Sequence, residues 1–120
     1  MDKSYANFLQ HQDRYNLNLV CAQFATVGYG VFLVGSCLYR PDYRDVDVRC
    51  ILSDDQFAAL PIPCTLDACV SEWMRQRTGL PIDFQFQGQT DANANHKGKR
   101  IALGHFFNVP KASSSEREED

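Results

Sequence analysis

The sequence predicts an α+β domain with a small mixed sheet and helices on one face of it. Three observations predict this class. A stretch with helical apolar spacing precedes a short, wholly apolar run over residues 31–34. Two later segments alternate apolar and polar residues, as half-buried strands do, and a second stretch with helical spacing lies between them.

The first helix is expected over residues 15–27, where apolar residues recur every three or four positions: Leu17, Val20, Cys21, Phe24 and Val27. Gly28 and Gly30 end it. The run Val31-Phe32-Leu33-Val34 is typical of a strand that is covered on both faces. Gly35-Ser36 stops this strand, and residues 37–44 form a connection with room for one helical turn.

The two alternating segments each predict a strand with one apolar and one polar face. In the first, which starts at Asp45, Asp47 and Arg49 share a face with Asp45, opposite Val46, Val48, Cys50 and Leu52. The second follows Pro81, and it sets Asp83, Gln85 and Gln87 against Ile82, Phe84 and Phe86. Both strands therefore carry aspartates on the side away from the core.

Two helices are expected between these strands. Ser53-Asp54-Asp55 has the composition of a helix start and leads into a short helix as far as Leu60, stopped by prolines. A longer helix is expected over Thr65–Thr78, with Gly79 at its C-terminal end. Residues 88–100 lack periodicity and are expected to form a long loop. Residues 101–109 fit either a short strand or an irregular packed segment.

Composition limits the class of protein. The 120 residues allow one domain, expected over residues 1–110, followed by a disordered acidic tail over 111–120. The net charge is −3, but two of the 12 basic and four of the 15 acidic residues lie in that tail, so the body is close to neutral. This excludes a strongly basic polyanion binder.

No apolar run reaches the ~18 residues of a membrane span. No signal-peptide pattern follows Met1, and a cytoplasmic location is expected. The five cysteines are an odd number without a C-x-x-C motif, which favours reduced, buried thiols.

The aspartates are the candidate catalytic and metal-ligating residues. Asp45 and Asp47 project in the same direction from one strand, and Asp83 joins them if its strand lies alongside. Converging carboxylates repel one another unless a cation or a proton neutralises them. Sites made of oxygen ligands suit Mg²⁺, which also binds substrate phosphates. An Asp-x-Asp motif on a strand is otherwise more often just part of a solvent-exposed face.

Two further segments are candidates for phosphate binding. Gly35-Ser36 ends a buried strand, where a residue without a Cβ lets a phosphate approach backbone N–H groups, although a lone glycine more often marks a tight turn. The basic segment His96-Lys97-Gly98-Lys99-Arg100 offers Lys97, Lys99 and Arg100 to a triphosphate or a nucleic acid. A solvated loop explains that segment equally well.

Together these motifs resemble the nucleotidyltransferase superfamily of the DNA polymerase β type, in particular its minimal members, among them phage and prophage versions. The resemblance covers residues 15–87 and rests on the apolar strand ending in Gly35-Ser36, on Asp45-Val46-Asp47-Val48, and on the later Ile82-Asp83-Phe84. It implies that Gly35 and Ser36 hold the triphosphate and that Asp45 and Asp47 bind metal. It also implies that Asp83 completes the site and activates the acceptor hydroxyl.

Two functions of different classes follow. The first is a Mg²⁺-dependent nucleotidyltransferase that moves a nucleoside monophosphate from an NTP, with ATP as the expected one, to an acceptor such as RNA, a protein or a small molecule. The second is an inactive nucleotide-binding or protein-interaction module on the same fold. It is motivated by the short connection with Arg40-Pro41 and by Arg44 directly before the first aspartate. A homo-oligomer and a partner protein both remain open.

Overall fold

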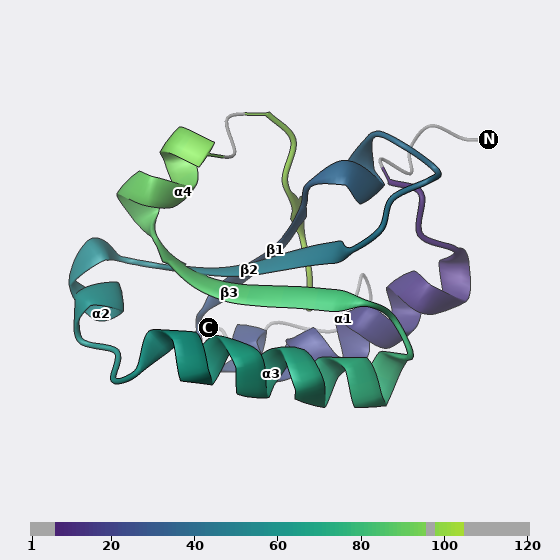
Figure 1. Ribbon diagram of the computed structural model, residues 1–120. Coiled ribbons are helices and arrows are strands. Elements are labelled where there is room, and N and C mark those ends of the chain that lie inside the picture. Colours follow the sequence, from purple (N-terminus) through teal and green to yellow (C-terminus); the bar gives the residue numbers. More distant parts are fainter. Residues whose placement is uncertain (1–6, 96–97, 105–120) are drawn as a thin grey trace, which may run out of the picture.

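The structure, a computed structural model, describes residues 7–95 and 98–104. They form an α+β fold around a small mixed sheet (Figure 1). The elements in chain order are α1 (His11–Thr26), β1 (Gly30–Val34), the 3₁₀ turn η1 (Ser36–Leu38), β2 (Val46–Leu52), α2 (Asp54–Ala58), α3 (Pro63–Thr78), β3 (Ile82–Gly88), α4 (Gln89–Asn95) and β4 (Ile101–Ala102).

The four described strands lie in the order β3-β2-β1-β4. β1 pairs antiparallel with both β2 and β4, whereas β2 and β3 are parallel. Because parallel neighbours need a crossover connection, the chain leaves the sheet between β2 and β3 and returns through α2 and α3. The expected small mixed sheet is confirmed.

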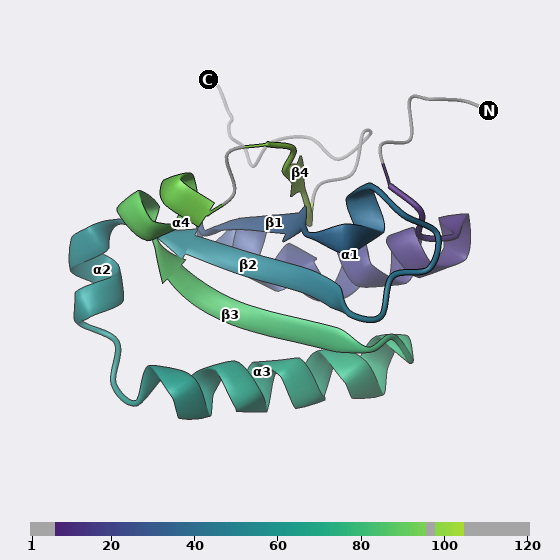
Figure 2. The same cartoon turned by 45° about the horizontal axis from the view of Figure 1, so that its top comes forward.

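The core lies between the sheet and the two long helices, α1 and α3, which cover the same face (Figures 1 and 2). Apolar positions of β1, β2 and β3 point there, as the alternation predicts for β2 and β3. Phe84 lies at the centre, with ring centroids 5.6 Å from Phe24 of α1 and 5.0 Å from Phe86. The fully buried residues of this layer include Leu17, Cys21, Val31, Leu33, Val46, Val48, Cys50, Met74, Ile82 and Phe84.

Helix α3 also covers the outer edge of β3. Its side chains Asp67, Ser71 and Arg75 are four residues apart and therefore share one helix face. Asp67 accepts a hydrogen bond from the Phe86 N–H at 2.9 Å. Ser71 accepts from the Phe84 N–H at 2.8 Å, and the Arg75 Nε–H donates to the Ile82 carbonyl at 2.9 Å. These three side chains take the place of a neighbouring strand and keep the edge from pairing with another chain.

Most helix ends lie close to where the sequence predicts them. Ser53 and Gln56 form a reciprocal capping box at the start of α2. Pro63 is the first residue of α3, and Gly79 ends that helix with φ of 74°. Directly before Pro63, Ile62 has φ of 38°, a left-handed conformation that is unusual for a β-branched residue.

The prediction of a loop over residues 88–100 is wrong for its first half, because Gln89–Asn95 form helix α4. Its first turn is fixed by Asp54 of α2. Asp54 accepts hydrogen bonds from the Thr90 N–H at 3.0 Å and from the Thr90 hydroxyl at 2.6 Å. α4 lies on the side of the sheet away from α1 and α3 (Figure 2). Of the segment 101–109, for which a strand and an irregular segment were both expected, the first two residues form strand β4. Residues 105–109 and the expected tail over 111–120 lie outside the described residues.

The thiols of Cys21, Cys37 and Cys50 are buried, as expected, whereas Cys64 and Cys69 are exposed on α3. Burial raises the pKa of Cys21 and of Cys50 to about 12, so both remain protonated. Among the described residues, no helix combines the length and the apolar character that crossing a bilayer requires.

Candidate functional site

Two of the three predicted aspartates lie side by side in the sheet. Asp47 of β2 pairs with Asp83 of β3 and, on its other side, with Val34, the last residue of β1. Residues that pair across neighbouring strands project to the same face, with Cβ atoms roughly 5 Å apart. Both carboxylates therefore lie on the face opposite the α1 and α3 layer, next to the end of β1.

Gly35 brings the turn after β1 directly against Asp47. Its φ of 84° and ψ of −159° fall in a region that is essentially restricted to glycine. A Cβ at this position would overlap the Asp47 Oδ2 and would lie 3.0 Å from the Asp47 Cγ. The predicted turn glycine and the predicted metal ligand are thus neighbours, and the absence of a side chain at residue 35 leaves the space that the carboxylate uses. Ser36 follows as the first residue of η1.

Arg49 lies between the two carboxylates, on the strand face that it was expected to share with Asp47. Its Nη2 is 3.6 Å from Asp83 Oδ2 and 4.0 Å from Asp47 Oδ1. Its Nη1 donates to the main-chain carbonyls of Asp83 at 2.7 Å and of Val48 at 3.0 Å. The residue is 8% exposed, so this guanidinium is a buried positive charge at the centre of the polar face.

Burial is the largest influence on Asp47 and raises the pKa of its carboxyl group. Arg49 acts in the opposite direction, and the charges of Asp83 and Asp45 add to the rise. The influence of Asp45 places it within electrostatic range of Asp47, although Asp45 itself precedes β2 and is exposed. The three predicted aspartates therefore form one electrostatic group, of which Asp47 is the most enclosed member.

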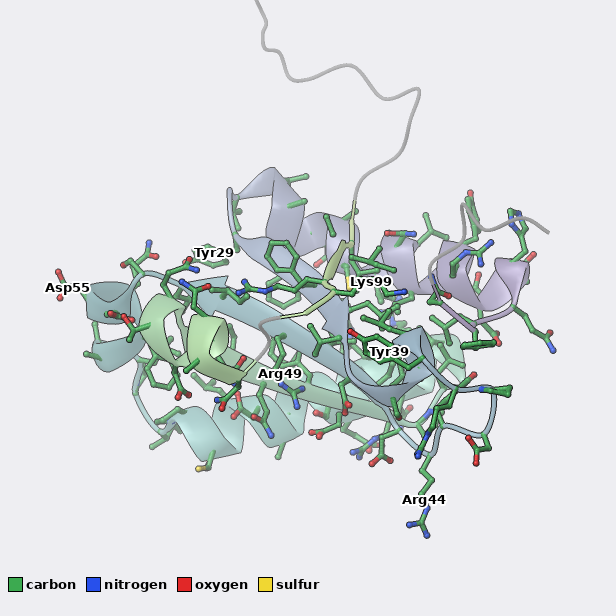
Figure 3. All side chains as sticks on the ribbon, turned by 90° about the horizontal axis from the view of Figure 1, so that it is seen from above. Tyr29, Tyr39, Arg44, Arg49, Asp55 and Lys99 are labelled. Atoms are coloured by element: carbon green, nitrogen blue, oxygen red, sulfur yellow. The ribbon has the colours of Figure 1, made fainter. Side chains whose placement is uncertain are left out.

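The other nearby arginines lie away from this group. Arg40 pairs with Asp42 at 3.5 Å, and both side chains are largely exposed. Arg44 projects away from the body of the protein (Figure 3). Arg40 and Arg49 thus each pair with aspartates, Arg40 at the surface and Arg49 in a buried position.

The basic segment lies on the same side of the protein as the candidate site. The Lys99 N–H donates to the Tyr39 hydroxyl at 3.1 Å, and its Nζ lies 5.2 Å from the centre of that ring. Tyr39 directly follows η1 and so connects Lys99 to the turn that begins at Gly35. Figure 3 looks onto this face, with Lys99 close to Tyr39 and Arg49 between that pair and α4.

Arg100 is held on the neighbouring side. Its guanidinium donates to Asn93 Oδ1 of α4 at 2.6 Å and lies 6.0 Å from the centre of the Phe32 ring. Phe32 pairs with Arg49 across β1 and β2, so it belongs to the same face. Lys97, the third predicted basic residue, lies outside the described residues. Sequence reasoning missed Tyr39 and Asn93, since neither belongs to a periodic pattern or a motif.

A pocket of about 340 Å³ adjoins the third aspartate. It lies between α3 and β3 and is lined by Cys64, Asp67, Ala68, Ser71, Arg75, Asp83, Phe84 and Gln85. Asp83 therefore pairs with Asp47 and also borders this pocket between α3 and β3.

Within residues 7–95 and 98–104, no three or more His, Cys, Asp or Glu side chains are already grouped so as to hold a metal ion. Comparison of the chain with models of known protein families finds no match. Comparisons with curated proteins and with solved structures find none either.

Proposed function

We propose that this protein is a Mg²⁺-dependent nucleotidyltransferase with a nucleotidyltransferase-like fold, which moves a nucleoside monophosphate from an NTP to an acceptor hydroxyl. One observation carries the proposal: Asp47 and Asp83 pair in adjacent strands at the point where Gly35 turns the chain against Asp47. Three motifs far apart in the sequence thereby meet at one place, as the resemblance implies.

The donor chemistry of this place fits Mg²⁺. Carboxylate oxygens from Asp47, Asp83 and the exposed Asp45 are the ligands that this ion takes. A cation would offset the burial, and the repulsion by Asp83 and Asp45, that raise the pKa of Asp47. Mg²⁺ bound there would neutralise charge on the triphosphate. Arg49 holds part of that position now, so these residues can receive the ion but are not a preformed cage.

The residues of the chain have separate roles in the proposed reaction. The N–H groups of the turn at Gly35 and Ser36 bind the triphosphate, and Lys99 and Arg100 add positive charge beside it. The acceptor oxygen attacks the α-phosphorus while the bond from that phosphorus to the pyrophosphate oxygen breaks. Pyrophosphate leaves with the bonding electrons, and the proton of the acceptor hydroxyl passes to Asp83. The pocket between α3 and β3 offers the acceptor, be it RNA, a protein or a small molecule, a path to Asp83.

Calorimetric titration with ATP, with and without Mg²⁺, tests the proposal together with transfer of label from [α-³²P]ATP. We expect Mg²⁺-dependent binding, and we expect Asp47→Asn and Asp83→Asn to lower transfer at least about a hundredfold, the loss typical of removing an electrostatic contact to the reacting group. Asp55→Asn is the matched control, because Asp55 is exposed at the far end of the molecule (Figure 3). Unchanged transfer by Asp47→Asn would refute the proposal.

Arg49 favours a second candidate function, an inactive nucleotide-binding or protein-interaction module. Its guanidinium already neutralises Asp47 and Asp83, which is what a purely structural ion pair would do. The same titration distinguishes the candidates. ATP binding that depends neither on Mg²⁺ nor on the aspartates supports a nucleotide-binding module, and the absence of ATP binding supports a protein partner.

A further inference from the structure

The contacts of Arg49 divide its guanidinium into two parts. Nη1 is fixed by two main-chain carbonyls, at 2.7 and 3.0 Å. Nη2 faces the carboxylates of Asp83 and Asp47 at 3.6 and 4.0 Å, which is beyond the range of a good hydrogen bond. Arg49 therefore interacts with these carboxylates mainly through its charge, not through hydrogen bonds.

The third nitrogen of the group is unsatisfied. The Nε–H of Arg49 is buried and has no hydrogen-bond partner among the described residues. A buried donor without a partner costs free energy, and a charged donor costs more than a neutral one. The resting position of Arg49 thus leaves one of its charged donors unsatisfied, and moving the side chain would break only the two hydrogen bonds of Nη1.

We propose that Arg49 is a resident counter-ion that competes with the divalent cation for Asp47 and Asp83. This inference rests on the proposed function, because it takes the metal site of that proposal as its starting point. A guanidinium at this distance lowers the affinity of the carboxylates for a second cation in two ways. It repels the ion directly, and it must give up its own contacts before both carboxylates can ligate metal. Arg49 thereby prevents the aspartates from binding metal tightly in the absence of nucleotide.

Binding of Mn²⁺ alone, measured by electron paramagnetic resonance, tests the inference without any turnover. Arg49→Gln and Arg49→Met both remove the charge, and we expect either to tighten Mn²⁺ binding about tenfold or more. Arg49→Lys keeps the charge, and it should stay within about threefold of wild type. Arg40→Gln is the control, because the Arg40 pair with Asp42 is exposed and includes neither Asp47 nor Asp83.

Two results would overturn the inference. One is equal Mn²⁺ affinity of the wild type and a folded neutral variant. The other is equal tightening by Arg49→Lys, which would show that the charge is not the cause. Should both neutral variants fail to fold, the wild-type chain still gives an answer. Saturating Mg²⁺ should shift the Nε–H resonance of Arg49 in a nitrogen-15 spectrum, and an unchanged resonance with Mg²⁺ bound contradicts displacement.

The outcomes separate this inference from the proposed function. Tighter Mn²⁺ binding by the neutral variants, with no nucleotidyl transfer by any form, leaves the inference standing and refutes the function. Transfer by the wild type, together with a Mn²⁺ affinity that does not depend on Arg49, supports the proposed function and refutes the inference. Absence of Mn²⁺ binding in every variant refutes both.

Discussion

Replacing Gly35 by alanine tests the closest contact of the candidate site. The backbone conformation at this residue, with φ of 84° and ψ of −159°, costs a non-glycine residue roughly 1–3 kcal/mol. The added Cβ would also overlap the carboxylate of Asp47 and would lie 3.2 Å from the Asp47 Cβ. Overpacking of this kind typically costs roughly 1–3 kcal/mol more. We therefore expect Gly35→Ala to lower the free energy of unfolding by about 3 kcal/mol.

Gly79→Ala is the matched control for this prediction. Gly79 also has a positive φ, of 74°, but a Cβ there would meet nothing within 4 Å. Its replacement should therefore cost only the conformational part, about 1 kcal/mol. Both variants reduce the entropy of the unfolded chain equally, so the difference between them contains the contact with Asp47 and the larger conformational cost at residue 35.

Urea unfolding of the two single variants, of Asp47→Ala and of the double variant Gly35→Ala/Asp47→Ala provides the assay. Removing the carboxylate should recover about 1 kcal/mol of the loss caused by Gly35→Ala, because the shortest contacts disappear while the Cβ of residue 47 remains. Equal losses for Gly35→Ala and Gly79→Ala, combined with no recovery in the double variant, would refute the placement of Gly35 against Asp47.

Three further predictions concern the site and its support. The pKa of Asp47 is higher in the folded than in the unfolded protein, so ionisation of this carboxyl group opposes folding. The stability that its protonated form contributes is therefore lost as pH rises from about 4 through the folded pKa. Asp47→Asn should therefore gain stability relative to wild type over that range in urea titrations at several pH values, and a constant difference would contradict this. Ser71→Ala should lower the free energy of unfolding by about 2 kcal/mol, because the buried N–H of Phe84 loses its partner; a loss under about 0.5 kcal/mol would contradict the edge contact. Ile62→Gly should raise the melting temperature by a few degrees, since it relieves a left-handed conformation at an exposed side chain, and a lower value would count against that conformation.

The sequence allowed the central strands and the placement of the aspartates to be predicted, because both depend on local periodicity. Alternation determines that Asp47 and Asp83 lie on the opposite side of their strands from Val48 and Phe84. It does not determine which strands pair or in which register, and the direct pairing of Asp47 with Asp83 arises from the packing of the whole sheet. The conditional expectation that the strand of Asp83 lies alongside is met for this pair.

Helix α4 and the surroundings of the basic segment could not be predicted for a related reason. The first turn of α4 is fixed by Asp54, 36 residues earlier in the chain, so no local pattern announces it. Lys99 is likewise placed by Tyr39, 60 residues away. The charge of Arg49 was recognised beside Asp47, but its burial between both carboxylates depends on the strand register. The features that the sequence does not reveal therefore depend on contacts between residues that are distant in sequence.

The proposed reaction depends on Asp47 and Asp83 holding a divalent cation beside Gly35. Paramagnetic broadening of backbone amide resonances by substoichiometric Mn²⁺ tests it most directly, because the effect falls steeply with distance from the ion. We expect the amides of Gly35, Asp47 and Asp83 to broaden first, and Asp47→Asn to abolish the effect at all three. Broadening centred on exposed carboxylates such as Asp55, with these three amides unaffected, would contradict the account.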